Sequence, residues 1–380
     1  MKRRITIVAA AVLAAVHAYG GITETAVNAA APGFGLQPRN KALTVCFVGD
    51  ALTSQPQNVS TISGIIHNHF EAAANIRFSG FSAATGTFPQ CAAPKKGMCG
   101  TEACDQYPED IRIALDGTTI NGTPVTRMIP ATDTHCVDKG APSSWGVSPW
   151  NVDKPEYRAC RYNVFIGSDS DTSVSPPRLW VNHTLHEVGH ALGFIHEFIQ
   201  ADFFNFIGPN GSICTTSTSE PGALTNPAGF VSLTPADAAS VMMYVDSSCG
   251  IHGNYAHTGL SGLDRLSLHI FYPEDARVAE YLGTTTIKVN QTLRLRSLLA
   301  ARGARMDRVV SKLKWTIGGI VGTTPTFETS WSTPGTRSGT LEYDDFVGRH
   351  FSVPITVRVV TPTDFARRAG ASSAARGPLL

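Results

Sequence analysis

Residues 186–197 of this 380-residue chain read His-Glu-Val-Gly-His-Ala-Leu-Gly-Phe-Ile-His-Glu, and no other run constrains the fold as strongly. His186 and His190 are four positions apart, so on an α-helix they lie about 40° apart around the axis and can bind one ion. Gly193 can end that helix and turn the chain, which would bring His196 to the same ion. Three imidazole nitrogens leave one position of a tetrahedral zinc ion open, as in catalytic sites. The run therefore predicts a helix that carries a catalytic zinc site.

Glu187 directly follows the first histidine, where it can contact a zinc-bound water without binding the ion itself. As general base it would take the proton of that water during attack on a scissile carbonyl, and return it to the leaving amine. The sequence thus predicts a zinc endopeptidase with one Zn²⁺ as cofactor and proteins or peptides as substrates. In the competing interpretation, the run is a buried amphipathic helix whose histidines are only hydrogen-bonded.

The run from His186 to His196 resembles the signature of the metzincin zinc peptidases. Glu197 follows it and resembles the astacin family in particular, although the chain then continues Phe-Ile-Gln-Ala-Asp and lacks the arginine-rich run usual in astacins. The resemblance covers residues 41–273. It implies an α+β catalytic domain in which a twisted mixed sheet accompanies the active-site helix.

A second motif agrees with this resemblance. Residues 240–244 read Ser-Val-Met-Met-Tyr and resemble the Met-turn of metzincins. By this resemblance, Met242 forms an apolar floor beneath the metal, and Tyr244 reaches the zinc and helps to stabilise the oxyanion. Met243 competes for the first role, but only Met242 has the tyrosine at the family's offset. Without the zinc motif, the same residues would indicate ordinary core packing.

The same resemblance predicts the remaining elements of the catalytic domain. Strands are expected at 43–48, 76–78 and 110–115, a long helix at 65–74 and a closing helix at 263–272. Phe47-Val48-Gly49-Asp50 also matches the segment by which astacin propeptides place an aspartate on the zinc. We favour a strand here, because residues 43–48 match the first strand of the domain and the first helix follows soon after.

The N-terminus predicts the compartment. Three basic residues precede an apolar run from Ile5 to Val16, which is typical of a signal peptide over residues 1–18 and too short to span a bilayer. Residues 19–40 would be a short propeptide or a linker. An exported protein of this kind is expected to be secreted, with no transmembrane anchor.

All eight cysteines lie within residues 41–273, and in an exported chain they predict disulfides with 105 possible pairings. They are Cys46, Cys91, Cys99, Cys104, Cys136, Cys160, Cys214 and Cys249. A second zinc site at Cys99 and Cys104 is the alternative, which an oxidising compartment disfavours.

After residue 273 the pattern changes to an alternation of period two. Leu313, Trp315 and Ile317 point one way, and the residues between them point the other. Similar runs near 284–289, 292–299, 326–331, 339–346 and 353–359 predict an antiparallel β-sandwich over residues 284–362. It resembles immunoglobulin-like domains appended to secreted enzymes, with Trp315 anchoring its core. Residues 363–380 are predicted to be disordered.

The formal charge of +1 argues against a nucleic-acid partner, but the charge is unevenly distributed. Residues 274–380 contain 15 basic and 9 acidic residues, a net charge of +6, and the rest of the chain carries −5. A basic C-terminal domain could associate with an anionic cell surface, although a merely solvated exterior also explains this charge. Two rival functions stay open: an inactive metzincin-like secreted binding or adhesion protein, and a zinc enzyme that acts on a non-peptide bond. Glu187 favours an enzyme over a scaffold.

Overall fold

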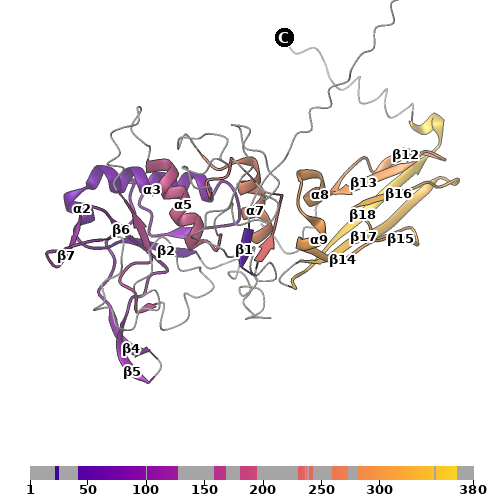
Figure 1. Cartoon of the computed structure of the whole chain (residues 1–380). Coiled ribbons are helices and arrows are strands. Elements are labelled where there is room, and N and C mark those ends of the chain that lie inside the picture. Colours follow the sequence, from indigo (N-terminus) through magenta and orange to yellow (C-terminus); the bar gives the residue numbers. More distant parts are fainter. Residues whose placement is uncertain are drawn as a thin grey trace, which may run out of the picture.

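The computed structural model describes residues 22–24, 42–99, 101–126, 158–167, 180–194, 230–235, 237, 239–242, 259–272, 281–345 and 348–365. They form a mixed α/β protein with several sheets (Figure 1). We refer to residues 42–272 as the N-terminal body and to residues 281–365 as the C-terminal two-sheet unit, because each contains a large hydrophobic core. The predicted signal segment, His196, Glu197, Met243, Tyr244 and the tail from residue 366 lie outside the described residues.

Up to residue 272, the described helices and strands are short and follow one another closely. In chain order they are β1 (Ile22–Glu24), β2 (Leu43–Phe47), α2 (Ala51–Ser54), α3 (Pro56–Phe70), β3 (Phe78–Ser79), β4 (Lys95–Cys99), β5 (Glu102–Gln106), β6 (Ile111–Leu115), β7 (Thr119–Ile120), β8 (Thr123–Pro124), β9 (Val164–Ile166), α5 (Trp180–Ala191), β10 (Phe230–Ser232) and α7 (Gly262–Phe271).

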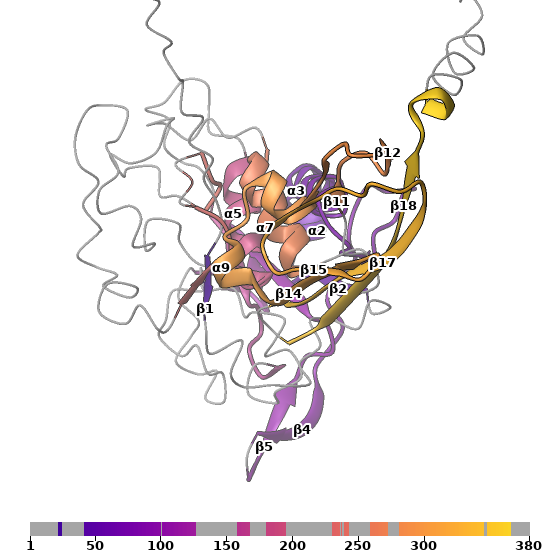
Figure 2. The ribbon, with the colours of Figure 1, turned by 90° about the vertical axis from the view of Figure 1, so that its right-hand side faces the viewer.

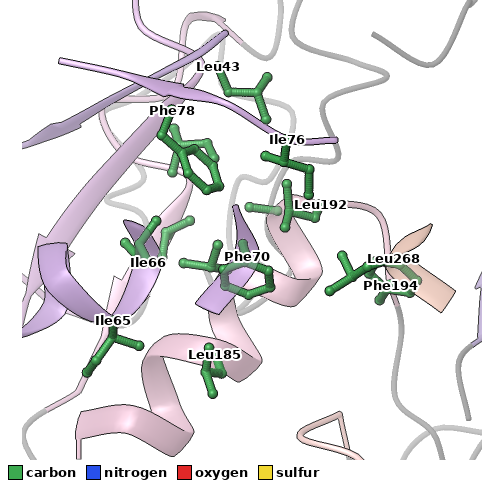
Figure 3. Packing of buried hydrophobic residues seen from close by; sticks show 14 of the residues in the cluster. Leu43, Ile65, Ile66, Phe70, Ile76, Phe78, Leu185, Leu192, Phe194 and Leu268 are labelled. Atoms are coloured by element: carbon green, nitrogen blue, oxygen red, sulfur yellow. The ribbon is translucent and has the colours of Figure 1, made fainter. Parts of the chain in front are cut away.

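A four-stranded sheet with the order β3-β2-β6-β9 forms the centre of the N-terminal body. Its described strand pairs are all parallel, whereas a mixed sheet was predicted. Every residue of β6 is buried, as expected for a parallel sheet that is covered on both faces. α5 packs against β9 and α3, and Phe70, Leu185 and Leu268 bring α3, α5 and α7 into one core (Figure 3). This core holds the histidine-bearing helix rigidly against the sheet.

The sequence placed some elements better than others. β2 and β6 lie at the predicted strands, and α7 differs by one residue at each end from the predicted helix at 263–272. α3 begins nine residues before the helix predicted at 65–74, because Pro56 can start a helix and Val59 and Ile62 lie on its buried face. The strand predicted at 76–78 is reduced to β3.

Phe47–Asp50 belongs to the folded body rather than to a propeptide. Phe47 ends β2, and the carboxylate of Asp50 accepts hydrogen bonds from the backbone N–H and the hydroxyl of Thr119, at 2.7 and 2.9 Å. These hydrogen bonds lower the pKa of Asp50. The carboxylate therefore joins the end of β2 to β7, which supports the strand interpretation.

Disulfides bind the described cysteines. Cys46 is bonded to Cys91, and Cys99 is bonded to Cys104 at the end of the β4–β5 hairpin, which projects from the body (Figures 1 and 2). Cys160 is also in a disulfide. The Cys99–Cys104 bond contradicts the alternative of a zinc site at these two residues. The sulfurs of Cys46 and Cys91 lie near a carboxylate oxygen of Glu109, but sulfurs bonded to each other are not thiolate ligands.

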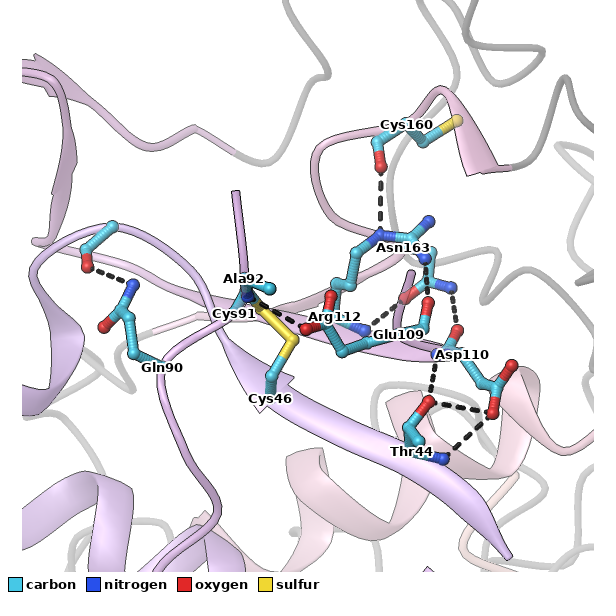
Figure 4. Close-up of a disulfide and its surroundings, with 11 residues drawn as sticks. Thr44, Cys46, Gln90, Cys91, Ala92, Glu109, Asp110, Arg112, Cys160 and Asn163 are labelled. Atoms are coloured by element: carbon cyan, nitrogen blue, oxygen red, sulfur yellow. Dashed lines mark hydrogen bonds between the residues drawn. A yellow bond between two sulfur atoms is a disulfide. The ribbon is translucent and has the colours of Figure 1, made fainter. Parts of the chain in front are cut away.

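A buried arginine beside the first disulfide connects β6 to the segment before β9 (Figure 4). Arg112 is 2% exposed, and its guanidinium donates to the carbonyl oxygens of Cys160, at 3.0 Å, and Glu109. Its backbone N–H donates to the side-chain oxygen of Asn163 at 2.8 Å. Burial lowers the pKa of Arg112 to about 10, so the side chain keeps its charge at neutral pH.

The C-terminal two-sheet unit consists of two sheets over one core that surrounds the fully buried Trp315. The sheets have the orders β11-β13-β16 and β12-β18-β17-β14-β15. Their elements, with two short helices, are β11 (Tyr281–Leu282), β12 (Thr286–Lys288), β13 (Leu293–Ser297), α8 (Leu298–Arg302), α9 (Met306–Val309), β14 (Val310–Ile317), β15 (Ile320–Gly322), β16 (Thr326–Thr329), β17 (Gly335–Asp345) and β18 (His350–Val360).

The predicted alternation and the role of Trp315 agree with this architecture, but one pairing differs. Ile355, Val357 and Val359 are buried on β18 and Trp315 and Ile317 on β14, with more exposed residues between them. However, β12 pairs with β18 in parallel, so the prediction of a purely antiparallel unit was wrong. Alternation shows which face of a strand is buried and does not encode the direction of its neighbour.

The two regions are in direct contact at the end of α7. The guanidinium of Arg349 donates to the carbonyl oxygens of Ile270 and Phe271, at 3.3 and 3.5 Å, and pairs with Asp345. The backbone N–H of Arg305 donates to the carbonyl oxygen of Leu233 at 3.1 Å. The C-terminal two-sheet unit is therefore hydrogen-bonded to the segments that flank the site described below.

Two further findings concern the ends of the predicted domains. Within residues 19–40, Ile22–Glu24 is described, and this β1 pairs antiparallel with β10. Among the described helices, none has the length and apolar character required to cross a bilayer.

Candidate functional site

The two histidines of the motif lie on the last turns of α5 and face each other. His186 is 7% exposed and His190 is 4% exposed. Their rings are nearly perpendicular, at 88°, with centroids 4.7 Å apart. Their Nε2 atoms are 3.1 Å apart. The helix therefore brings two imidazoles together within a buried region of the protein, as the i, i+4 spacing predicts.

The other nitrogen of each ring contacts a backbone carbonyl. Nδ1 of His186 is 2.7 Å from the carbonyl oxygen of Val241, and Nδ1 of His190 is 2.8 Å from that of Phe194. Because a carbonyl oxygen can only accept, each Nδ1 carries a proton, and in a neutral ring this leaves the Nε2 lone pair available as an acceptor or ligand. Metal-binding histidines are commonly oriented in this way.

The distance between the Nε2 atoms allows them to share a metal. Two ligands of a tetrahedral zinc ion with Zn–N bonds of about 2.05 Å lie about 3.3 Å apart, and His186 and His190 are close to this value at 3.1 Å. A direct hydrogen bond between the two Nε2 atoms would require one ring to be protonated on both nitrogens. Such a buried imidazolium is costly unless it is compensated. The spacing of the two Nε2 atoms therefore fits two ligands of one metal ion.

The chain turns sharply after α5. Gly193 has a φ of +97°, and its N–H donates to the carbonyl oxygen of His190 at 2.9 Å, while the N–H of Phe194 donates to that of Gly189 at 3.1 Å. These are the two hydrogen bonds of a Schellman motif, in which the residue with left-handed backbone angles is usually glycine. The turn places the Phe194 carbonyl beside His190. His196, the third predicted ligand, follows two residues after the last described residue of this segment.

Met242 packs directly against α5 at Gly189. It is 3% exposed, and a Cβ atom added at Gly189 would lie 2.5 Å from its sulfur. Gly189 therefore allows the methionine to approach the helix backbone closely. The spacing of the motif predicts no role for Gly189. A glycine inside a helix costs about 1 kcal/mol relative to alanine, which is the signal that could have identified it.

Glu187, the predicted general base, is half-buried on α5, and its Oε2 atom is buried. It is adjacent in sequence to His186, so the two side chains leave the helix in different directions. Tyr244 lies outside the described residues. The structure thus brings together His186, His190, Gly193 and Met242, with Glu187 on the same helix.

The N-terminus of α7 holds the segment that orients His186. Asp264 accepts hydrogen bonds from the hydroxyl of Ser240 at 2.6 Å and from the N–H of Val241 at 3.1 Å, and it also accepts one from the N–H of Ser261. Ser261 and Asp264 form a capping box. The sequence Ser-x-x-Asp before an apolar run indicates such a cap, but the contact with Val241 could not be inferred from it.

A second carboxylate lies beside this cap. Asp237 accepts hydrogen bonds from the hydroxyl of Ser261 and from the N–H of Ala239. Burial, together with the nearby charge of Asp264, raises the pKa of Asp237 to about 7. At neutral pH, Asp237 is therefore partly protonated, which reduces the repulsion between the two buried acids.

The C-terminus of α7 holds the turn that orients His190. The hydroxyl of Tyr272 donates to the carbonyl oxygen of Leu192 at 2.8 Å, and burial raises the pKa of Tyr272 well above its usual value. Tyr272 therefore stays protonated and can donate this hydrogen bond. Leu192 and Phe194 flank the glycine turn (Figure 3), and the ring of Phe194 packs on Phe271.

No protein-family model matches this chain, and no curated protein is similar to it in sequence comparison. The functional interpretation therefore depends on the zinc motif and on the geometry of its described part.

Proposed function

We propose that this protein is a secreted zinc-dependent endopeptidase of the metzincin class, most similar to the astacins. The observation that best supports this proposal is that the Nε2 atoms of the buried His186 and His190 are 3.1 Å apart. Each ring is oriented by a backbone carbonyl oxygen that accepts a hydrogen bond from its Nδ1. The proximity of Met242 to the same helix supports the proposed Met-turn. The predicted signal segment and the disulfides support secretion. We also propose that the C-terminal two-sheet unit is an immunoglobulin-like domain.

In this proposal, His186, His190 and His196 hold one zinc ion. When bound, the ion supplies a Lewis acid that lowers the pKa of a water molecule to near 7. Glu187 accepts a proton from the attacking water and delivers it to the leaving amine. Tyr244 donates a hydrogen bond to the oxyanion of the tetrahedral intermediate. The carbonyl oxygens of Val241 and Phe194 keep the imidazoles in the tautomer that can bind a metal.

Replacing Glu187 with Gln tests the proposal, because the amide keeps the shape of the side chain but cannot accept the proton. We expect casein hydrolysis to fall by at least about a hundredfold, which is the usual contribution of a general base. The content of bound zinc, measured by elemental analysis, should stay near one ion per chain.

Glu102→Gln, at an exposed glutamate of the β4–β5 hairpin, is the control and should hydrolyse casein normally. Near-normal hydrolysis by zinc-loaded Glu187→Gln would contradict the assigned base. A zinc-loaded wild type that cleaves neither casein nor peptides would instead support a binding or adhesion protein, and cleavage of esters alone would indicate a different bond.

A further inference from the structure

The C-terminal two-sheet unit contains a groove that the proposed chemistry does not use. It has a volume of about 650 Å³ and lies between α8, α9, β14 and the segment between β15 and β16. Volumes of this size are typical of ligand-binding clefts. None of the candidate zinc-site residues that the structure describes lines it.

The walls of the groove are basic. Arg296, Arg305 and Lys312 line it, against a single acid, Asp307. These residues belong to a stretch, 294–314, that contains seven basic residues and one acidic residue. Three of these seven basic residues line the groove, so part of the positive charge of the C-terminal region faces one concave surface, where a low-dielectric wall strengthens its field.

The floor of the groove is apolar. Six of its lining residues are apolar, and all six are half-buried: Ala300, Ala304, Met306, Val310, Leu313 and Pro325. A floor of this kind favours ligands with apolar side chains. It is less suited to a polysaccharide, which offers hydroxyl groups, or to a flat membrane surface, which cannot enter a groove.

Two of the basic residues are held in defined positions. The guanidinium of Arg296 donates to the carbonyl oxygen of Ala300 at 3.0 Å. Lys312 has a φ of +52° within a β-bulge between β14 and β17, and its ammonium lies 2.7 Å from the carboxylate of Asp344. A bulge redirects side chains, and a left-handed backbone at a non-glycine residue costs free energy. The backbone of β14 is therefore strained at Lys312, whose side chain lines the groove.

We propose that this groove binds acidic peptide segments that also carry apolar side chains. Its use as a second substrate-binding site, which would retain a protein while another of its segments is cleaved, rests on the proposed peptidase function. The binding itself does not. In this arrangement the carboxylates of the peptide contact Arg296, Arg305 and Lys312, and its apolar side chains contact Val310 and Leu313.

The test measures fluorescence anisotropy of a fluorescein-labelled decapeptide of alternating Glu and Leu with the full-length chain carrying Glu187→Gln, at physiological salt. We expect Arg296→Gln to weaken its binding about fivefold, the effect of losing one solvent-exposed ion pair. Arg294→Gln is the matched control, because Arg294 lies two residues away on the same exposed face of β13 and pairs with Glu328 outside the groove. This control should change binding less than twofold.

Two comparison probes separate groove binding from general charge attraction. A Glu-Ser decapeptide should bind at least fivefold more weakly, and a Lys-Leu decapeptide should not bind. Equal losses in Arg296→Gln and Arg294→Gln, or equal binding of the Glu-Ser probe, would overturn the proposal. Binding of phosphatidylserine vesicles that requires Arg296, without binding of the Glu-Leu peptide, would assign the surface to a membrane and also overturn it.

A separate measurement shows whether the groove serves catalysis. With a peptide substrate that carries an acidic Leu-containing extension, Arg296→Gln should raise KM about fivefold and leave kcat unchanged. If the chain binds the Glu-Leu probe but hydrolyses no peptide, the binding site stands and the proposed peptidase function fails. If hydrolysis is normal and the probe does not bind, the proposed peptidase function stands and the proposed binding site fails.

Discussion

The N-terminal body and the C-terminal two-sheet unit differ in how many polar side chains they bury. Among the described residues, the body contains thirteen of the fifteen buried polar or charged side chains, and the unit contains only Ser297 and Asp345. In the body these groups form two sets of hydrogen bonds, one around β6 with Arg112 and Asn163 and one beside α7 with Ser240 and Asp264. Most charged side chains in the described part of the unit are instead exposed. Buried polar groups are costly unless they are satisfied, so their concentration indicates where the protein maintains a precise chemical geometry. The unit is instead suited to recognition at its surface.

Removing one of the two facing imidazoles should have the largest effect, because it tests whether the buried polar groups of the body form a metal site. His190→Ala should lower the affinity for zinc by orders of magnitude, because the remaining residues lose most of their chelation. Competition with a chromophoric chelator measures this affinity. His183→Ala, one turn earlier on α5, is the control and should retain the metal. Full zinc occupancy in His190→Ala would remove this histidine from the site.

A smaller effect is expected from one methyl group beneath the same helix. Gly189→Ala would place its Cβ 2.5 Å from the sulfur of Met242. Overpacking of this kind costs about 1–3 kcal/mol, so we expect a lower free energy of unfolding and weaker zinc binding. Urea denaturation and chelator competition measure the two quantities.

Gly64→Ala is the matched control, because Gly64 also lies inside a helix, α3, and the nearest atom to its added Cβ is 3.9 Å away. This substitution should stabilise the protein by about 0.5–1 kcal/mol through helix propensity. A stabilising Gly189→Ala would show that Met242 can move aside, and that the body is less tightly packed at the site than the comparison implies.

The last prediction concerns pH. The pKa of Asp237 is raised to about 7 from a usual value of 3.8, so the folded state binds this proton more tightly than the unfolded state. The contribution of Asp237 is therefore most favourable below pH 4, decreases as the pH rises from about 4 to 7, and is constant above that range. Urea denaturation at pH 5 and pH 8 should show that Asp237→Asn removes part of the stability difference between these values. An unchanged pH dependence in the variant would assign the difference to other groups.

The sequence predicted the part of the site that depends on local spacing. The positions of His186 and His190 on a helix and the turn at Gly193 follow from i, i+4 geometry and from the backbone freedom of glycine. The strands of the C-terminal two-sheet unit follow in the same way from period-two alternation. These patterns are short-range, so the residues that form each helix, turn or strand are the same residues that carry its sequence signal.

The parts that were missed depend on contacts between distant residues. Asp264 stabilises the backbone of Val241, 23 residues away, and Tyr272 binds the carbonyl of Leu192, 80 residues away. No local pattern in the sequence marks Val241 or Leu192 as the partner in these hydrogen bonds. The parallel pairing of β12 with β18 was missed for the same reason, because strand direction depends on the path of the whole chain.

α7 contacts both segments that orient the histidines: its first turn holds Val241, and Tyr272 at its end holds Leu192. A ten-residue helix is a stiff rod about 15 Å long, so a displacement at one end is transmitted to the other. The orientations of the two imidazoles thus both depend on a third element that contains neither of them. Because Arg349 donates to the carbonyl groups at the end of this rod, the C-terminal two-sheet unit contacts the same helix that positions both rings.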